Sequence, residues 1–194
     1  CLRKALRICF ILTNLHQNKL KGRLSKDLIM LVKPNITFMA LFTAWGGFWL
    51  APGEAATSVL LWTLVGTALI VGSANALNCY LEREIDGLMA RTKLRPLPAQ
   101  RMRPAIALVF GLCLGALALP ILYAFATPLT ALLAAFALVS YVWIYTPMKQ
   151  VSSWALLIGS VPGAMPPLLG WTAATWRLHA FYLGCRSPRD TLGH

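Results

Sequence analysis

Long runs of apolar residues, separated by short polar loops, dominate the pattern along the chain. Each run holds about 17 residues or more, enough for an α-helix to cross roughly 30 Å of hydrocarbon. Barrel strands would be shorter and would alternate apolar with polar positions. The pattern therefore predicts an all-α membrane protein with about five transmembrane helices. They are expected at 35–51 (extending back towards Leu28, with a kink at Pro34), 55–81, 105–125, 128–144 and 153–175, the last interrupted by Pro162, Pro166 and Pro167.

Basic residues in the loops alternate in a way that predicts the orientation. The loops after the first and third runs carry none, whereas Lys149 follows the fourth run. By the positive-inside rule, the N-terminus, the long second loop and the turn at 145–151 are expected on the cytoplasmic side of a bacterial inner membrane, or on the matrix side of a mitochondrial one. The basic residues behind this prediction are Arg3, Lys4, Arg7, Lys19, Lys21, Arg23, Lys26 and Lys33 before the first run, and Arg83, Arg91, Lys93, Arg95, Arg101 and Arg103 after the second.

The composition argues against a water-soluble domain and against a nucleic-acid-binding protein. Hydrophobic residues make up 58% of the 194 residues, charged residues only 12%, and the mean hydropathy is +0.64. A soluble domain carries about 25% charged residues. The net charge of +12 would suggest nucleic acid in a soluble protein, but here the cations lie between apolar runs. The lipid bilayer and an anionic substrate are the expected partners, and no nucleic acid is expected.

Small residues and cysteines add little chemistry. Gly111 and Gly115 form a GxxxG spacing, which predicts close helix contact inside one chain rather than in a dimer. The five cysteines form no CxxC pair. Neither a zinc site nor a disulfide framework is predicted.

Three polar residues form a stripe at the end of the second run. Asn78, Glu82 and Asp86 are spaced four apart and so share one helix face, from which Glu84 points away. Two like charges at this spacing repel each other, and ionisable groups near hydrocarbon are costly. A cation bound between the carboxylates would offset both penalties. Oxygen and amide ligands favour Mg²⁺ over zinc or copper.

A basic cluster follows the stripe directly. Arg91, Lys93 and Arg95 alternate with other residues, which suits the binding of phosphate oxygens. Taken separately, these cations could be ordinary positive-inside residues and the acids a solvated helix end. Their occurrence together at one helix end favours a site for a metal and a phosphorylated substrate.

Three stretches carry a family resemblance. Residues 75–98 (NALNCYLEREIDGLMARTKLRPLP) resemble the first aspartate-rich motif of the UbiA-type intramembrane prenyltransferases, with Glu82 at the middle acidic position. The ending 89–98 is most similar to the branch that makes heme O. Residues 145–149 (YTPMK) and 159–171 (GSVPGAMPPLLGW) resemble the turn between the fourth and fifth helices and the fifth helix of that branch.

The resemblance, which runs from about Lys26 to Thr175, implies transfer of a farnesyl group from farnesyl diphosphate to heme b. It implies Mg²⁺ as the cofactor and the N-terminal part of a UbiA-like helical bundle as the fold. The implied catalytic and metal-binding residues are Asn78, Glu82 and Asp86, and the implied substrate-binding residues are Arg91, Lys93, Arg95, Tyr145 and Lys149.

The resemblance also divides the chain. It predicts a basic segment at 1–27, a partial prenyltransferase region at 28–175 and an unrelated tail at 176–194. The family's second acidic motif is missing, since only Asp190 follows Asp86 among the acids. We therefore expect the chain alone to insert into a membrane without catalysing transfer. The alternatives are another UbiA-type enzyme with an aromatic or tetrapyrrole acceptor, and a non-catalytic membrane protein or inactive fragment.

Overall fold

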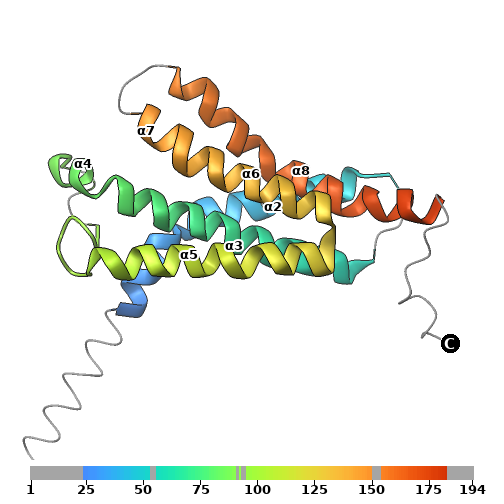
Figure 1. The fold of residues 1–194 in the computed structure, drawn as a ribbon, viewed down its shortest axis with the longest axis horizontal. Helices are drawn as coiled ribbons and strands as arrows, with labels where there is room; N and C mark the ends of the chain where they lie inside the picture. The colour runs from blue at the N-terminus through green and yellow to red at the C-terminus, as the bar shows by residue number, and fades with distance from the viewer. Residues whose placement is uncertain (1–23, 53–55, 91, 93–94, 150–153, 183–194) are drawn as a thin grey trace, which may run out of the picture.

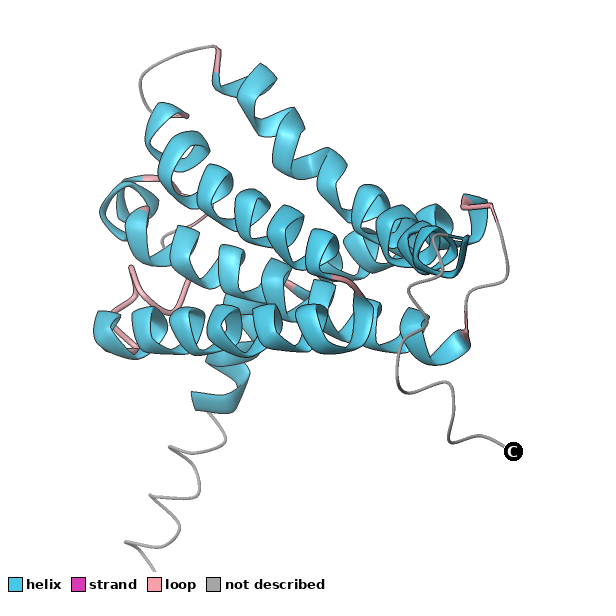
Figure 2. Ribbon diagram, turned by 45° about the vertical axis from the view of Figure 1, so that its right-hand side comes forward, coloured by secondary structure: helices cyan, strands magenta, loops and turns pink. Residues whose placement is uncertain are grey.

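The computed structural model describes residues 24–52, 56–90, 92, 95–149 and 154–182. Helices and the loops between them account for all of these residues, and no strand occurs among them (Figure 2). The elements are a helix at Leu24–Val32, α2 (Pro34–Leu50), α3 (Thr57–Leu81), α4 (Arg83–Leu88), α5 (Pro104–Ile121), the π-helical turn η1 (Leu122–Ala126), α6 (Pro128–Val139), a second π-helical turn η2 (Ser140–Tyr145), α7 (Thr146–Met148) and α8 (Ala155–Tyr182).

The predicted all-α membrane fold is confirmed. Three of the described helical stretches are long and apolar enough to cross a membrane: Thr57–Leu81, Pro104–Ala126 and Pro128–Met148. The bent pair Leu24–Val32 and Pro34–Leu50 raises the number to four, rather than the five expected. The difference lies in α8, where prolines and glycines lower the mean hydropathy of a 28-residue helix. The helix nevertheless runs without a break through Pro162, Pro166 and Pro167, where the sequence predicted an interruption.

The predicted kink at Pro34 is confirmed. The two helices on either side of it meet at 44°, and Lys33 between them adopts a left-handed conformation with φ 52°. A residue before proline is driven out of the helical region. The carbonyl of Val32 accepts hydrogen bonds from Thr37 Oγ1 at 3.0 Å and Asn75 Nδ2 at 3.1 Å, so the bend leaves it satisfied.

Small residues bring helices together at two places. Between α3 and α5, Ser73 Oγ donates to the Gly111 carbonyl at 2.7 Å, and a Cβ on Gly111 would lie 2.9 Å from the Leu77 Cγ. The GxxxG contact within the chain is thereby confirmed. Between α2 and α8, a Cβ on Gly170 would overlap the Ala44 carbonyl oxygen, and one on Gly47 would overlap that of Pro167. We call this second contact the glycine crossing.

The bundle has two unlike ends (Figure 1). One end carries α4, the beginning of α5 and α7, and we call it the polar end. The glycine crossing lies towards the other end, where α2 and α8 approach each other. Segments far apart in sequence therefore meet at the polar end, where the predicted site residues lie.

Candidate functional site

The predicted polar stripe is intact in the structure. Asn78, Glu82 and Asp86 are all buried, with 2%, 7% and 5% of their surface exposed. A turn at Glu82 separates α3 from α4, but backbone bonds from Glu82 N to Asn78 O (2.9 Å) and from Asp86 N to Glu82 O (2.8 Å) carry the four-residue repeat through it. Glu84 points away from the stripe to solvent, as the spacing predicted, and there it pairs with Arg83.

Each carboxylate of the stripe has a cation. Arg95 Nη1 lies 2.5 Å from Asp86 Oδ2, and Lys149 Nζ lies 3.3 Å from Glu82 Oε1. The second pair joins residues 67 positions apart. Five of the eight predicted site residues thus meet at one place. Arg91 and Lys93 lie outside the described residues.

The loop between α4 and α5 holds Arg95 in position. Thr92 Oγ1 donates to the Asp86 carbonyl at 2.8 Å, and Arg95 N donates to the Thr92 carbonyl at 2.9 Å. Further along the loop, Leu97 and Met102 are buried in a small apolar cluster with Leu31 and Cys79. This packing anchors the loop on the helices beside the stripe.

Asp27 is a polar residue at this end that sequence reasoning did not single out. It is 3% exposed, and its Oδ1 lies 3.6 Å from Arg101 Nη2. The pair ties the helix at Leu24–Val32 to the α4–α5 loop. Asp27 stands as a lone acid within a basic N-terminal segment, and this feature of the sequence could have identified it. A buried acid requires a nearby cation, and such a segment supplies many.

Tyr145, also a predicted site residue, lies on the apolar side of the site. Its ring is 5.2 Å from that of Tyr141, and a Cβ on Gly159 of α8 would lie 2.5 Å from its Cε2. Lys149 N donates to the Tyr145 carbonyl at 3.0 Å, so the turn that positions Tyr145 also positions Lys149. Tyr145 therefore borders the cavity described below and does not pair with the stripe.

The stripe fits Mg²⁺ better than a softer metal. Asn78 Oδ1 is buried without a hydrogen-bond partner. Within the described ranges, no three His, Cys, Asp or Glu side chains come together to hold a metal. The donors are therefore one amide oxygen and two carboxylates. Mg²⁺ commonly binds one or two carboxylates and completes its shell with water and substrate phosphates.

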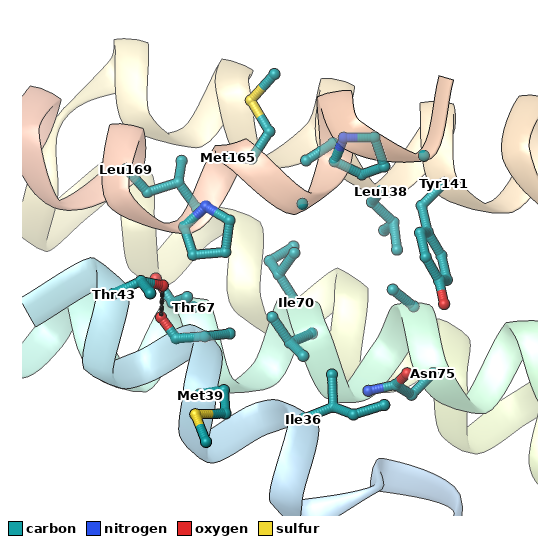
Figure 3. Close-up of a pocket in the computed structure, with 18 of the residues that line it drawn as sticks. Ile36, Met39, Thr43, Thr67, Ile70, Asn75, Leu138, Tyr141, Met165 and Leu169 are labelled. Carbon is teal, nitrogen blue, oxygen red and sulfur yellow. Dashed lines mark hydrogen bonds between the residues drawn. The ribbon is translucent and has the colours of Figure 1, made fainter. Parts of the chain in front are cut away.

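An apolar cavity of about 340 Å³ begins next to the stripe. Tyr141, which lies close to Asn78 and Glu82, lines it at the polar end together with Asn75. Figure 3 shows the cavity passing from these residues between α2, α3 and α8 towards Thr67 and Leu169. A charged site thus opens onto an apolar slot, an arrangement that suits a ligand with a polyanionic head and a hydrocarbon tail.

These features define an integral membrane protein with a buried cluster of ion pairs beside an apolar cavity. The chain belongs to the UbiA prenyltransferase family, which it matches over residues 40–185.

Individual relatives agree with this membership. The chain is 55% identical over 156 residues to a protoheme IX farnesyltransferase of Anaeromyxobacter sp. (strain Fw109-5), covering 80% of this chain and 53% of the relative. It is 55% identical over 151 residues to a protein of the same name from Myxococcus xanthus (strain DK1622), covering 78% and 51%. The chain spans about half the length of the curated relatives it matches. No solved structure gives a significant match.

Proposed function

We propose that this chain provides the diphosphate-binding part of an enzyme that transfers a farnesyl group from farnesyl diphosphate to heme b, giving heme O. The observation that carries the proposal is the buried stripe of Asn78, Glu82 and Asp86, paired with Arg95 and Lys149 beside an apolar cavity. The names of the relatives favour the heme acceptor over others.

The chain's residues divide the chemical work. Asn78, Glu82 and Asp86 would hold Mg²⁺, which when bound stabilises negative charge on a departing diphosphate. Arg95 and Lys149, with Arg91 and Lys93 from the same basic cluster, would bind diphosphate oxygens and oppose the same developing charge.

The apolar cavity would keep the reacting end of the chain away from water. In the proposed reaction the allylic C–O bond breaks and diphosphate leaves. The electron pair of a heme vinyl group forms the new C–C bond and leaves a cation on the other vinyl carbon. Water adds to that cation and releases a proton to the departing diphosphate or to solvent, giving a hydroxyethylfarnesyl side chain. Exclusion of water until that bond has formed prevents hydrolysis of the allylic cation.

The activity is tested with the chain alone and with a chimaera in which the remaining half of the Myxococcus xanthus relative follows Thr175. Membranes containing each protein receive Mg²⁺, farnesyl diphosphate and heme b, and heme O is measured by chromatography. We expect product from the chimaera and none from the chain alone. A chimaera that inserts and folds without making heme O contradicts the proposal. Product from an aromatic acceptor in place of heme b would support the alternative acceptor class.

The proposed orientation places the N-terminus and the polar end in the cytoplasm of a bacterium whose inner membrane holds the protein. Labelling of single cysteines from the cytoplasmic side tests it. In a cysteine-free background, a Cys at Gln100, which is exposed, should react, and a Cys at Gly53 should not. The reverse pattern would invert the topology.

A further inference from the structure

The lining of the apolar cavity ends, on the side away from the stripe, next to the glycine crossing. At the glycine crossing the backbones of α2 and α8 touch, since any Cβ on Gly47 or Gly170 would overlap a carbonyl oxygen of the other helix. Thr67 and Leu169 lie on the cavity side of this contact, and both line the cavity (Figure 3). The slot therefore runs from Asn75 and Tyr141, which lie next to the stripe, to a fixed end at the crossing.

The distance from the stripe to the far end of the slot can be measured along α3. Asn78 and Thr67 are 11 residues apart on this helix, and a rise of 1.5 Å per residue places them about 16 Å apart. An extended chain advances roughly 1.2 Å per bond, because three backbone bonds span about 3.3–3.6 Å. At that rate the main chain of a geranyl, farnesyl or geranylgeranyl group reaches roughly 10, 14 or 19 Å from the diphosphate oxygen. The slot admits the first two in full and not the third.

The residues at the closed end are suited to act as a stop. Thr67 is fully buried and Leu169 is 2% exposed, so neither can move aside into lipid. Thr67 Oγ1 has no hydrogen-bond partner among the described residues. A further hydrocarbon unit in contact with this hydroxyl would therefore gain little free energy, because the contact is not between two apolar groups. Ile70, one turn nearer the stripe, offers only apolar surface.

We propose that Thr67 and Leu169 set the length of the prenyl chain that this site accepts, with the fifteen-carbon chain as the longest that fits extended. The proposal rests on the proposed function, because it takes the stripe as the place where the diphosphate is held. It assigns to these two residues a role in specificity that is separate from the charged groups.

The test compares binding of ten-, fifteen- and twenty-carbon prenyl diphosphates to the full chain in lipid nanodiscs, with and without Mg²⁺. Ratios between chain lengths are compared across variants, so that partition of each lipid into the bilayer cancels. Each methylene that gains or loses burial changes affinity by about fourfold. We expect the fifteen-carbon ligand to bind at least tenfold more tightly than the ten-carbon ligand, and at least as tightly as the twenty-carbon ligand.

Variants move the stop in opposite directions. Leu169→Ala deepens the slot and should raise the ratio of twenty- to fifteen-carbon affinity by about three- to tenfold. Thr67→Leu shortens the slot and should lower fifteen-carbon affinity relative to ten-carbon affinity by a similar factor. Met165→Ala, on the same wall but only half-buried, is a second deepening variant if Leu169→Ala does not fold. Leu157→Ala, an exposed leucine of α8 outside the cavity, is the matched control and should leave every ratio unchanged.

The outcomes separate this proposal from the proposed function. Ratios that stay within twofold of the parent chain in folded deepening and shortening variants overturn the role of Thr67 and Leu169 while leaving the diphosphate site in place. Failure of all three diphosphates to bind in a Mg²⁺-dependent manner overturns the proposed function itself. Thermal unfolding followed by circular dichroism identifies the variants that are folded.

Discussion

The two ends of the bundle are held together by different physics. At the polar end, buried carboxylates pair with the partly exposed side chains of Arg95 and Lys149. At the other end, the glycine crossing brings two backbones into contact, and hydroxyls of Thr127, Thr130 and Thr172 bond one another. The ion pairs can exchange partners, because a long cationic side chain can release a carboxylate and bind another anion. The backbone contact cannot be exchanged in this way, because a helix backbone has no alternative rotamers.

This contrast separates residues kept for binding from residues kept for architecture. A buried ion pair is weak evidence for stability, since desolvation offsets much of its Coulombic attraction. Under the proposed function, the pairs at the polar end are therefore better explained by ligand binding than by stability. Close backbone contact, by contrast, is how membrane helices associate without a hydrophobic driving force. Substitutions at the two ends should accordingly divide between loss of binding and loss of stability.

The largest effect on binding is expected at the stripe. Asp86→Asn and Glu82→Gln each remove one negative charge from the proposed metal-binding set, and we expect Mg²⁺-dependent binding of farnesyl diphosphate to fall about a hundredfold or more. The same changes should abolish transfer in the active chimaera. Glu84→Gln is the matched control, because this side chain is 83% exposed and lies off the stripe. Parent-like binding in both stripe variants would refute the metal assignment and weaken the contrast between the ends.

The largest effect on stability is expected at the crossing. Gly170→Ala places a Cβ on the Ala44 carbonyl oxygen, and both groups belong to helix backbones that can separate only by losing other contacts. We expect a loss of about 3 kcal/mol in the free energy of unfolding, at the upper end of typical overpacking costs. The measurement is denaturant unfolding in detergent micelles.

Gly163→Ala, on the same helix, is the control for this substitution. A Cβ at Gly163 meets nothing within 4 Å, so alanine should be neutral or should stabilise the helix by up to about 1 kcal/mol. Equal behaviour of the two variants would show that the crossing is not the tight contact that the structure describes.

Sequence reasoning was strongest where the information is local. The four-residue spacing placed Asn78, Glu82 and Asp86 on one face, Pro34 marked the bend, and Gly111 with Gly115 marked a helix contact. Each of these follows from periodicity or from the geometry of one residue type. These predictions could be made without knowing which distant segment packs against each residue.

Sequence reasoning was weakest where distant segments meet. The pairing of Lys149 with Glu82 and of Asp27 with Arg101 depends on how helices pack, which no spacing reveals. The prolines of α8 were expected to interrupt the span. The helix continues because each proline removes a single backbone donor, and a long membrane helix retains its other bonds. The glycines of the crossing gave no GxxxG spacing, so nothing distinguished them from other glycines in the sequence.

Partner exchange at the polar end gives a smaller and more specific prediction. Lys149→Met removes a cation that neutralises Glu82, so the affinity for farnesyl diphosphate should fall about tenfold, the value of one charge-assisted contact. Binding of Mn²⁺ alone, followed by electron paramagnetic resonance, should instead strengthen, because the metal no longer competes with the ammonium group for Glu82. Lys149→Arg keeps the charge and is the control. A parallel loss of metal and diphosphate binding would show that Lys149 supports the metal site rather than competing with it.

The smallest effect is expected from the hydroxyls at the far end. Thr130 Oγ1 lies 2.7 Å from Thr127 Oγ1 and 3.1 Å from Thr172 Oγ1, so it joins the beginning of α6 to α8. Thr130→Val keeps the shape and removes this link, leaving Thr172 its bonds to carbonyls of its own helix. Polar contacts between membrane helices contribute about 0.6 kcal/mol on average, so a loss of about 0.5–1.5 kcal/mol is expected in the unfolding assay, with diphosphate binding unchanged. Thr43→Val is the control, because among the described residues Thr43 Oγ1 bonds the Ala40 carbonyl of its own helix and no other helix, and this variant should lose less. A loss at Thr130 comparable with that at Gly170 would mean that hydroxyl bonding, and not backbone contact, sets the geometry of this end.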